Sequence, residues 1–366
     1  MALKCGIVGL PNVGKSTLFN SLSSTKAQAA NFPFCTIEPN MSVVLVPDPR
    51  LDKLADLVKP QKVLPTTVEI VDIAGLVKGA SKGEGLGNMF LGNIRNTNAI
   101  VHVVRCFEND NVVHVDGSVD PVRDKEVIDT ELQLKDLEAV EKGIQKWNKA
   151  GKGGDKEAKR AEGIMHDLEA HLGSGKSARQ FEIEEELWEK YIKPLDLLTA
   201  KPVIYVCNVN EEDAVNGNAH VERLKEAVKH ENAEVIIISV AIESDISELE
   251  SKEDQIAFLE DIGLKEPGVN KLIRACYSLL NLITYFTAGE KEVRAWTVKV
   301  GSTAPQAAGV IHTDFERGFI RAEVIKYNDY VSLGSESAVK DAGKMGVEGK
   351  DYIVKDGDIM HFRFNV

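Results

Sequence analysis

The chain lacks the features that mark secreted, membrane-bound and disulfide-linked proteins. Its five cysteines are odd in number, far apart and never in C-x-x-C spacing, which indicates reduced thiols and neither a disulfide framework nor a zinc site. No apolar run is long enough to span a bilayer, and Gly, Pro, Asn and Lys interrupt the N-terminus before a signal peptide can form. We therefore expect a cytoplasmic protein without a membrane partner.

An excess of basic residues is also absent. The 44 Lys and Arg are outnumbered by 57 Asp and Glu, and the net charge of −13 argues against a globally basic nucleic-acid binder, with no DNA partner implied. Local basic patches remain compatible with this balance. A length of 366 residues, 43% of them hydrophobic, predicts an ordinary globular protein of two or three domains.

Apolar, β-branched segments alternate with helical patterns through much of the chain. Such runs are typical of buried strands in a mostly parallel α/β sheet with helices on both faces, where ligands bind at the carboxyl ends of the strands. The six predicted strands are residues 3–8, 41–46, 67–72, 99–105, 203–209 and 234–240.

Residues 9–16, GLPNVGKS, fit the pattern G-x-x-x-x-G-K-[ST] between the first strand and a helical turn. In that context the glycines let backbone N–H groups curl around phosphates, and the following helix adds its positive end. Lys15 would supply a mobile charge for the β- and γ-phosphates, so we predict that it binds nucleotide and takes part in catalysis. The Ser16 hydroxyl is placed to ligate Mg²⁺.

Two further segments suit a triphosphate and its metal. Asp72 ends a buried strand and opens the pattern D-x-x-G, so we expect it to hold Mg²⁺ through water, while the N–H of Gly75 approaches the γ-phosphate. Residues 31–36 are expected to form a mobile loop whose Thr36 reaches the metal when triphosphate is bound. An ordinary loop threonine is the alternative.

The base-reading element should follow the fifth strand, at Asn208, Val209, Asn210 and Glu211, with Ser239 after the sixth strand. GTPases use N-K-x-D here, and its aspartate accepts hydrogen bonds from guanine. Val209 replaces that lysine, and Glu211 carries an extra methylene in place of the aspartate, so guanine preference should be lost. We predict adenine as the base, with a variant GTPase as the alternative.

The group that orients the attacking water is an open question. Leu76 stands where signalling GTPases place a glutamine, and leucine cannot hydrogen-bond water. His114, in the loop of residues 107–117 after the fourth strand, is a candidate on the γ-phosphate side, and a surface histidine without a role is the alternative. Asn12 is a second candidate, as a ligand for a monovalent cation that replaces the charge of an arginine finger.

Between the fourth and fifth strands, two amphipathic patterns predict an antiparallel helical hairpin with a glycine-rich tip at residues 150–155. Residues 142–179 hold nine Lys or Arg against five Asp or Glu. This surplus favours an anion-facing arm with RNA as its partner, and a solvated helix face is the alternative.

The last part of the chain changes character. After residue 268 an apolar pattern predicts a helix that ends near Gly289, followed by a small β-rich domain. Its predicted strands are residues 293–300, 309–311, 323–325, 330–333, 352–354 and 358–364. We assign residues 1–122 and 200–285 to a nucleotide-binding domain, 123–199 to the helical insertion and 286–366 to the C-terminal domain.

Long motif blocks resemble one family, the Obg-like ATPases of the YchF type among the P-loop NTPases. The blocks are GLPNVGKST at 9–17, NFPFCTIEPN at 31–40, DIAGLVKGAS at 72–81, NxxE at 208–211 and HTDFERGFIRAEVI at 312–325. The resemblance covers essentially the whole chain, including the insertion and a C-terminal TGS domain. It implies a G-domain-like fold and the hydrolysis of ATP in preference to GTP.

The resemblance also implies roles for single residues and for partners. It places Asn12, Val13, Gly14, Lys15, Ser16 and Thr17 on the phosphates, Val209 at the base, and Ser16 and Thr36 on magnesium. Related GTPases that replace the catalytic glutamine respond to K⁺, which fits Leu76 and Asn12, and a histidine in the loop matching 107–117 is implicated in hydrolysis, which supports His114. Association with the ribosome, its large subunit or RNA is expected of a nucleotide switch. The alternative is a binding module whose nucleotide turnover is incidental.

Overall fold

The structure is a computed structural model that describes residues 3–24, 40–73, 86–115 and 117–365. The predicted site residues Thr36 and Gly75 lie outside these ranges, as does Leu76 at the glutamine position. The described chain divides into two compact units: one contains the phosphate loop and Glu69–Leu272, and the other contains Val43–Val68 and the residues from Ile273 onward. The division into three domains stays a prediction.

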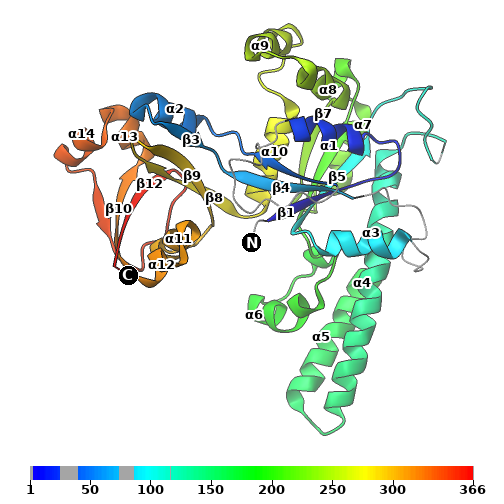
Figure 1. Cartoon of the computed structure of the whole chain (residues 1–366). Coiled ribbons are helices and arrows are strands. Elements are labelled where there is room, and N and C mark those ends of the chain that lie inside the picture. Colours follow the sequence, from blue (N-terminus) through cyan, green and yellow to red (C-terminus); the bar gives the residue numbers. More distant parts are fainter. Residues whose placement is uncertain (1–2, 25–39, 74–85, 116, 366) are drawn as a thin grey trace. The chain divides into compact units, whose positions relative to one another are not determined.

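The first sheet matches the six predicted strands. They are β1 (Lys4–Val8), β2 (Met41–Leu45), β4 (Thr67–Asp72), β5 (Ala99–Arg105), β6 (Val203–Asn208) and β7 (Glu234–Ile238). Their order is β2-β4-β1-β5-β6-β7, and β1 pairs in parallel with β4 and β5, as β6 does with β5 and β7. The predicted, mostly parallel α/β sheet is therefore confirmed (Figure 1).

The central strands explain the continuous apolar runs of the sequence. Every residue of β5 and β6 is buried, as expected for strands that are covered on both faces. Around this sheet lie α1 (Lys15–Ser24), α3 (Leu86–Arg95), α7 (Ala219–Val228), α8 (Val240–Glu248), α9 (Lys252–Asp261) and α10 (Gly268–Leu279). No helix in the described ranges has the length and hydropathy needed to cross a membrane.

The predicted helical hairpin is present as α4 (Pro121–Gly151) and α5 (Lys156–Gly173), which run side by side (Figure 1). Asp120 caps α4 by accepting hydrogen bonds from the N–H groups of Val122 and Arg123, and Pro121 suits the first helical position. Apolar residues of both helices form the core of the hairpin: Val140, Ala161, Met165, Leu168 and Leu172 are buried, and Leu137, Ile144 and Trp147 pack against them.

The hairpin is joined to the sheet by short segments and by one buried carboxylate. The segments are the 3₁₀ turns Ala178–Gln180 and Lys193–Leu195, α6 (Glu185–Leu187) and a π-helical turn at Trp188–Ile192. Asp136 of α4 accepts hydrogen bonds from the N–H groups of Leu198 and Thr199, at 2.7 and 2.8 Å, just before β6. These bonds fix the base of the hairpin to the segment that leads into the sheet.

The second unit is built on another six-stranded sheet, in the order β11-β10-β12-β8-β9-β3. Its strands are β3 (Lys62–Leu64), β8 (Leu282–Ala288), β9 (Glu292–Lys299), β10 (Phe319–Lys326), β11 (Gly346–Glu348) and β12 (Asp358–Phe364). Its helices are α2 (Pro49–Val58), α11 (Ala304–Ile311), α12 (Thr313–Arg317), α13 (Tyr327–Leu333) and α14 (Glu336–Asp341). The predicted β-rich C-terminal part is thus present.

Several predicted elements of this unit were wrong. The helix predicted to end near Gly289 stops at Leu279, because Asn281 takes a left-handed turn with φ of 54° and the apolar residues that follow pair as β8 with β9. Residues 309–311 and 330–333 belong to α11 and α13, not to strands. A capping box of Thr303 and Gln306 begins α11, a signal that the short apolar run concealed. Residues 352–354 contribute a single isolated bridge, from Ile353.

Candidate nucleotide site

The predicted phosphate loop connects the end of β1 to the start of α1. Gly14 has φ of +98°, and a Cβ atom on it would stand 2.5 Å from Nδ2 of Asn208. Both observations require glycine, because other residues rarely adopt this backbone conformation and would also clash. Asn12 adopts a left-handed φ of 62° as well, which asparagine tolerates better than most residues. The residue types at positions 12 and 14 therefore determine the backbone conformation of this loop.

Asn208 ties the loop to the other side of the site. Its Nδ2 donates a hydrogen bond to the carbonyl oxygen of Val13 at 3.0 Å, and its Oδ1 accepts one from the N–H of Val240 at 3.1 Å. The side chain is buried and both of its polar atoms have partners. Asn208 was predicted to bind nucleotide, and in this structure it holds the phosphate loop against the first residue of α8.

A cavity of about 470 Å³ opens beside these residues. Seven predicted residues line it: Asn12, Gly14, Thr17, Asn208, Val209, Asn210 and Glu211. The structure therefore brings the phosphate loop and the predicted base-reading segment to one cavity. Ser239 does not line it; this serine is buried, and its hydroxyl has no hydrogen-bond partner among the described residues.

Five further lining residues were not predicted: Phe107, Asn109, Val112, Val240 and Ala241. They follow β5 and β7 directly. Their position just after the carboxyl ends of parallel strands is the signal that could have identified them.

Lys15 is buried, with 8% of its surface exposed, and its Nζ donates a hydrogen bond to the carbonyl oxygen of Leu10 at 2.7 Å. Burial lowers the pKa of Lys15 from 10.5 to about 8, and the negative charge of Asp72 opposes this shift. The ammonium group is thus held inside the loop by one carbonyl and is poorly solvated. An incoming anion would compensate for that lost solvation.

Ser16 and Asp72 fit the chemistry of a magnesium site. Burial raises the pKa of Asp72, while the charge of Lys15 and a hydrogen bond from Ser16 lower it. Oδ1 of Asp72 is buried without a hydrogen-bond partner among the described residues, and oxygen atoms of this kind are the ligands that Mg²⁺ prefers. In the described part of the chain, no group of three His, Cys, Asp or Glu could hold a metal by itself. A magnesium ion here would therefore depend on the nucleotide's own oxygens and on water.

The loop after β5 carries His114, and Asn12 of the phosphate loop bonds to it; of these two residues, only Asn12 lines the cavity. Nδ2 of Asn12 donates a hydrogen bond to the carbonyl oxygen of Val113 at 3.1 Å. Nε2 of His114 lies 2.8 Å from Oδ2 of Asp124, in the first turns of α4. In this structure, His114 is thus paired with the hairpin helix.

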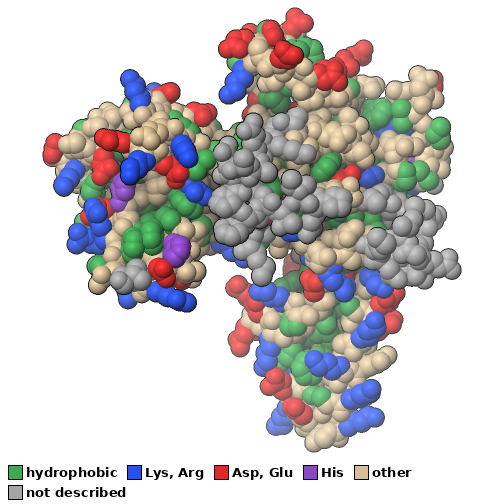
Figure 2. Space-filling view, viewed as in Figure 1, with side chains coloured by type: hydrophobic (Ala, Val, Ile, Leu, Met, Phe, Trp, Pro, Cys, Tyr) green, Lys and Arg blue, Asp and Glu red, His purple; other side chains and the backbone are tan. Residues whose placement is uncertain are grey.

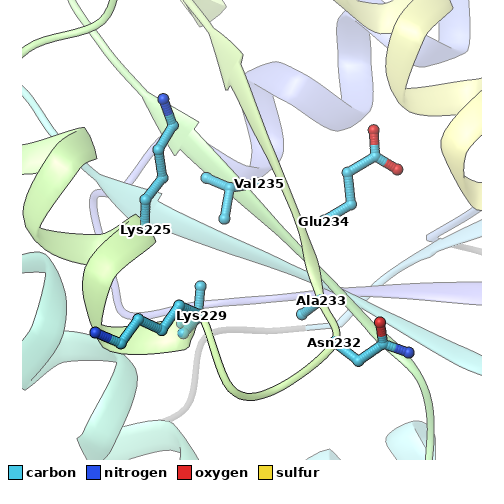
Figure 3. A pocket seen from close by; sticks show the side chains of 7 residues that line it. Lys225, Lys229, Asn232, Ala233, Glu234 and Val235 are labelled. Carbon is cyan, nitrogen blue, oxygen red and sulfur yellow. The ribbon is translucent and has the colours of Figure 1, made fainter.

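A second cavity, of about 540 Å³, lies where α7 ends and β7 begins, lined by Lys225, Val228, Lys229, Asn232, Ala233, Glu234 and Val235 (Figure 3). This is the amino end of a parallel strand, opposite to the end that binds ligands in such sheets. Lys225 and Lys229 are paired with Glu222 and Glu226 of the same helix, so the cavity holds no unpaired lysine charge for an anion.

The first strand of the parallel sheet leads through a glycine loop into a helix, and this loop shares a cavity with the segment after β6. These features define a P-loop NTPase domain of the G-domain class. A family model described as "50S ribosome-binding GTPase" matches residues 4–150. A second model, YchF-GTPase_C, described as a protein of unknown function, matches residues 282–365.

Full-length relatives define the family. "Ribosome-binding ATPase YchF" of Haemophilus influenzae is 58% identical over 366 residues, and its counterpart in Bacillus subtilis is 55% identical over 368, with both chains covered completely in each case. The solved YchF GTPase of Schizosaccharomyces pombe is 40% identical, with a TM-score of 0.89 over 99% of this chain and 97% of that one. The chain belongs to the YchF family.

Replacing Lys15 with Met should change the pH dependence of stability in the nucleotide-free protein. Because the folded-state pKa of about 8 lies below 10.5, the unfolded chain binds more protons between these values. The buried charge therefore destabilises the folded protein. This destabilisation is complete below pH 8 and disappears as the pH rises toward 10.5. Relative to the wild type, the free energy of unfolding of Lys15→Met should fall by on the order of 2 kcal/mol across this window.

Urea unfolding of both proteins at a series of pH values measures this difference. Lys142→Met, at an exposed position on α4, is the control and should follow the wild type at every pH. If the difference in free energy of unfolding between Lys15→Met and the wild type stays constant with pH, the pKa of Lys15 is not lowered by folding.

Proposed function

We propose that this chain is a Mg²⁺-dependent ATPase that works as a nucleotide switch in the cytoplasm and associates with ribosomes or RNA. The observation that carries the proposal is the single cavity shared by the phosphate loop and the segment from Asn208 to Glu211. The relatives in Haemophilus influenzae and Bacillus subtilis are named ribosome-binding ATPases.

In this proposal, backbone N–H groups from Asn12 to Thr17 surround the phosphates, and Lys15 moves from the carbonyl of Leu10 to the β- and γ-phosphate oxygens. Ser16, Thr36 and, through water, Asp72 would hold Mg²⁺, which neutralises phosphate charge. Gly75 would donate its N–H to the γ-phosphate. The exposure of Ser16 and the unpartnered Oδ1 of Asp72 support the metal ligands that lie in the described ranges.

Adenine is the base that this site fits best. Val209 is buried and lines the cavity, while Glu211 lines it as an exposed residue, at the start of a 3₁₀ turn at Glu211–Asp213. A glutamate on this turn holds its carboxylate one methylene further out than the aspartate that reads guanine, so the two donors of guanine lose their paired acceptor. GTP is the second candidate, because the Schizosaccharomyces pombe relative is named a GTPase.

Dissociation constants measured side by side test the base. We expect ATP to bind about tenfold or more tightly than GTP, and Glu211→Asp to reduce this ratio by about tenfold because it shortens the carboxylate arm. Glu212→Asp makes the same change at the next residue, also exposed, and should leave the ratio unchanged. Equal or GTP-favouring affinity in the wild type would contradict the adenine assignment.

His114 is proposed to act on the water that attacks the γ-phosphate, since leucine at position 76 cannot. A K⁺ ion near Asn12 would add positive charge on the same side. We expect His114→Ala to lower kcat by about a hundredfold or more, the range typical of a lost acid–base group, while the Kd for ATP stays within about twofold. His166→Ala, on the exposed surface of α5, is the control, and an unchanged kcat in His114→Ala would remove this residue from the mechanism.

The hairpin is the proposed contact with ribosomal RNA. Figure 2 shows basic side chains along the hairpin down to its tip, mixed with acidic ones. Lys149, Lys152 and Lys156 are exposed at the tip, where α4 turns into α5. Lysines at a projecting end can approach phosphates without bringing the acidic body of the protein close to them.

Changing Lys149, Lys152 and Lys156 together to Gln should weaken ribosome co-sedimentation and lower its salt dependence. Each phosphate contact that is lost should reduce the slope of log affinity against log salt by about one. The control is the triple change of Lys252, Lys265 and Lys271 to Gln, which removes the same charge from exposed positions outside the hairpin. Retained binding by the tip variant would discard the hairpin as the RNA contact.

A further inference from the structure

The loop between β5 and α4 has two parts that are held in different ways. Its first part, residues 107–112, lines the nucleotide cavity through Phe107, Asn109 and Val112. Its second part carries His114, which does not line the cavity. Any role of His114 at the γ-phosphate therefore requires the second part of the loop to change position, while the first part already lines the cavity.

Arg105 fixes the first part. This side chain is buried at the end of β5, and its guanidinium donates hydrogen bonds to the carbonyl oxygens of Phe107 at 3.0 Å, Asn109 at 3.1 Å and Val112 at 2.9 Å. It also lies over the Phe107 ring, 4.5 Å from its centroid. Three bonds from one buried cation hold residues 107–112 to the sheet, so movement is expected only beyond Val112.

Beyond Val112 the loop is held by the hydrogen bond from Nδ2 of Asn12 to the carbonyl oxygen of Val113, at 3.1 Å, and from the other side by α4. Nε2 of His114 is 2.8 Å from Oδ2 of Asp124, and the two side chains are only 6% and 3% exposed. The neighbours of the histidine have the opposite placement: Val113 is 75% exposed and Val115 is 58% exposed. A titratable side chain is thus buried between two apolar residues that face water. This arrangement depends on the His114–Asp124 pair, because the hydrophobic effect alone would favour burying Val113 and Val115 and exposing His114.

The end of the pair that belongs to α4 is rigid. Asp124 lies in the first turns of a helix that Asp120 caps, and Arg123 also donates to its Oδ1, at 3.0 Å. The next residue, Lys125, is bound to Glu231 at 2.6 Å in a buried network that includes Tyr205 of β6. Gly117, on the loop side, has a left-handed φ of +75°, and nothing lies within 4 Å of the place where a Cβ atom would stand. The histidine side is therefore the part that can move.

We propose that Asp124 is a positioning residue that restrains His114 in a resting state, and that breaking the His114–Asp124 pair lets the histidine reach the bound triphosphate. The inference rests on the catalytic role proposed for His114. It assigns Asp124 to the control of turnover, with no contact to nucleotide. It also places this control on α4, the helix that forms one arm of the hairpin.

Steady-state ATP hydrolysis by the full-length protein tests the proposal. Asp124→Asn keeps the size of the side chain and removes its charge, so it should raise basal kcat by about threefold to tenfold, the effect of losing one charge-assisted hydrogen bond on a two-state equilibrium. The KM for ATP should stay unchanged, because Asp124 does not line the cavity. In the double variant His114→Ala/Asp124→Asn the acceleration should disappear.

Two further variants distinguish release of the histidine from a general loosening or misfolding of α4. Asp120→Asn makes the same chemical change one turn earlier and keeps the helix cap, since asparagine caps as well as aspartate, and its kcat should equal that of the wild type. If Asp124→Asn does not fold, Asp124→Ser removes the carboxylate with a side chain that suits the start of a helix.

The outcomes separate this inference from the proposed function. The restraint alone would be overturned if His114→Ala lowers kcat but Asp124→Asn leaves kcat unchanged or lowers it. Asp124→Ser is read in the same way where it replaces Asp124→Asn. Equal acceleration by Asp120→Asn, or acceleration that persists without His114, would also overturn it, because loosening of the whole helix start would then be the cause. Wild-type turnover in His114→Ala would refute the catalytic role of the histidine and the restraint with it.

Discussion

The hydrogen bonds of the Asn208 amide are the contacts on which the nucleotide site depends. One amide group joins the phosphate loop at Val13 to the start of α8 at Val240, across the carboxyl edge of the sheet. Gly14 lies so close to this amide that no side chain fits between them. The cavity therefore has a fixed wall, formed where three loops after parallel strands meet.

The sequence predicted the parts of the site whose signals are local. A buried run of Val and Ile predicts β1, and the glycine spacing with the lysine and hydroxyl that follow predicts the phosphate loop and the start of α1. All of these signals lie within a few residues of one another along the chain. The role of Arg105 could not be predicted, because an arginine at the end of a strand gives no sign of bonding to carbonyls up to seven residues further on. The pairing of His114 with Asp124 was equally hidden, since it depends on where the loop meets α4.

The second unit was harder to predict for a related reason. Its helices and strands are short, and a run of three or four apolar residues fits either structure. In α11 and α13, residues at the ends of the helices favour helix over strand. A capping box at Thr303 begins α11, and Gly334, with a left-handed backbone, ends α13. In β8, by contrast, an apolar pattern that suits a helix became a strand because β9 lies beside it. Tertiary pairing overrode the local preference there.

Buried charged groups link the hairpin to the parallel sheet. Glu231 binds Lys125 of α4 at 2.6 Å and Tyr205 of β6 at 2.7 Å, while Asp136 holds the same helix to the residues before β6. Buried groups of this kind lose much stability when one partner is removed, so bending the base of α4 at these points would carry the cost of breaking the network. Through these bonds the first turns of α4 are held to the sheet. Those turns also carry Asp124, so the pair that holds His114 is anchored on a helix whose base is itself bonded to the sheet.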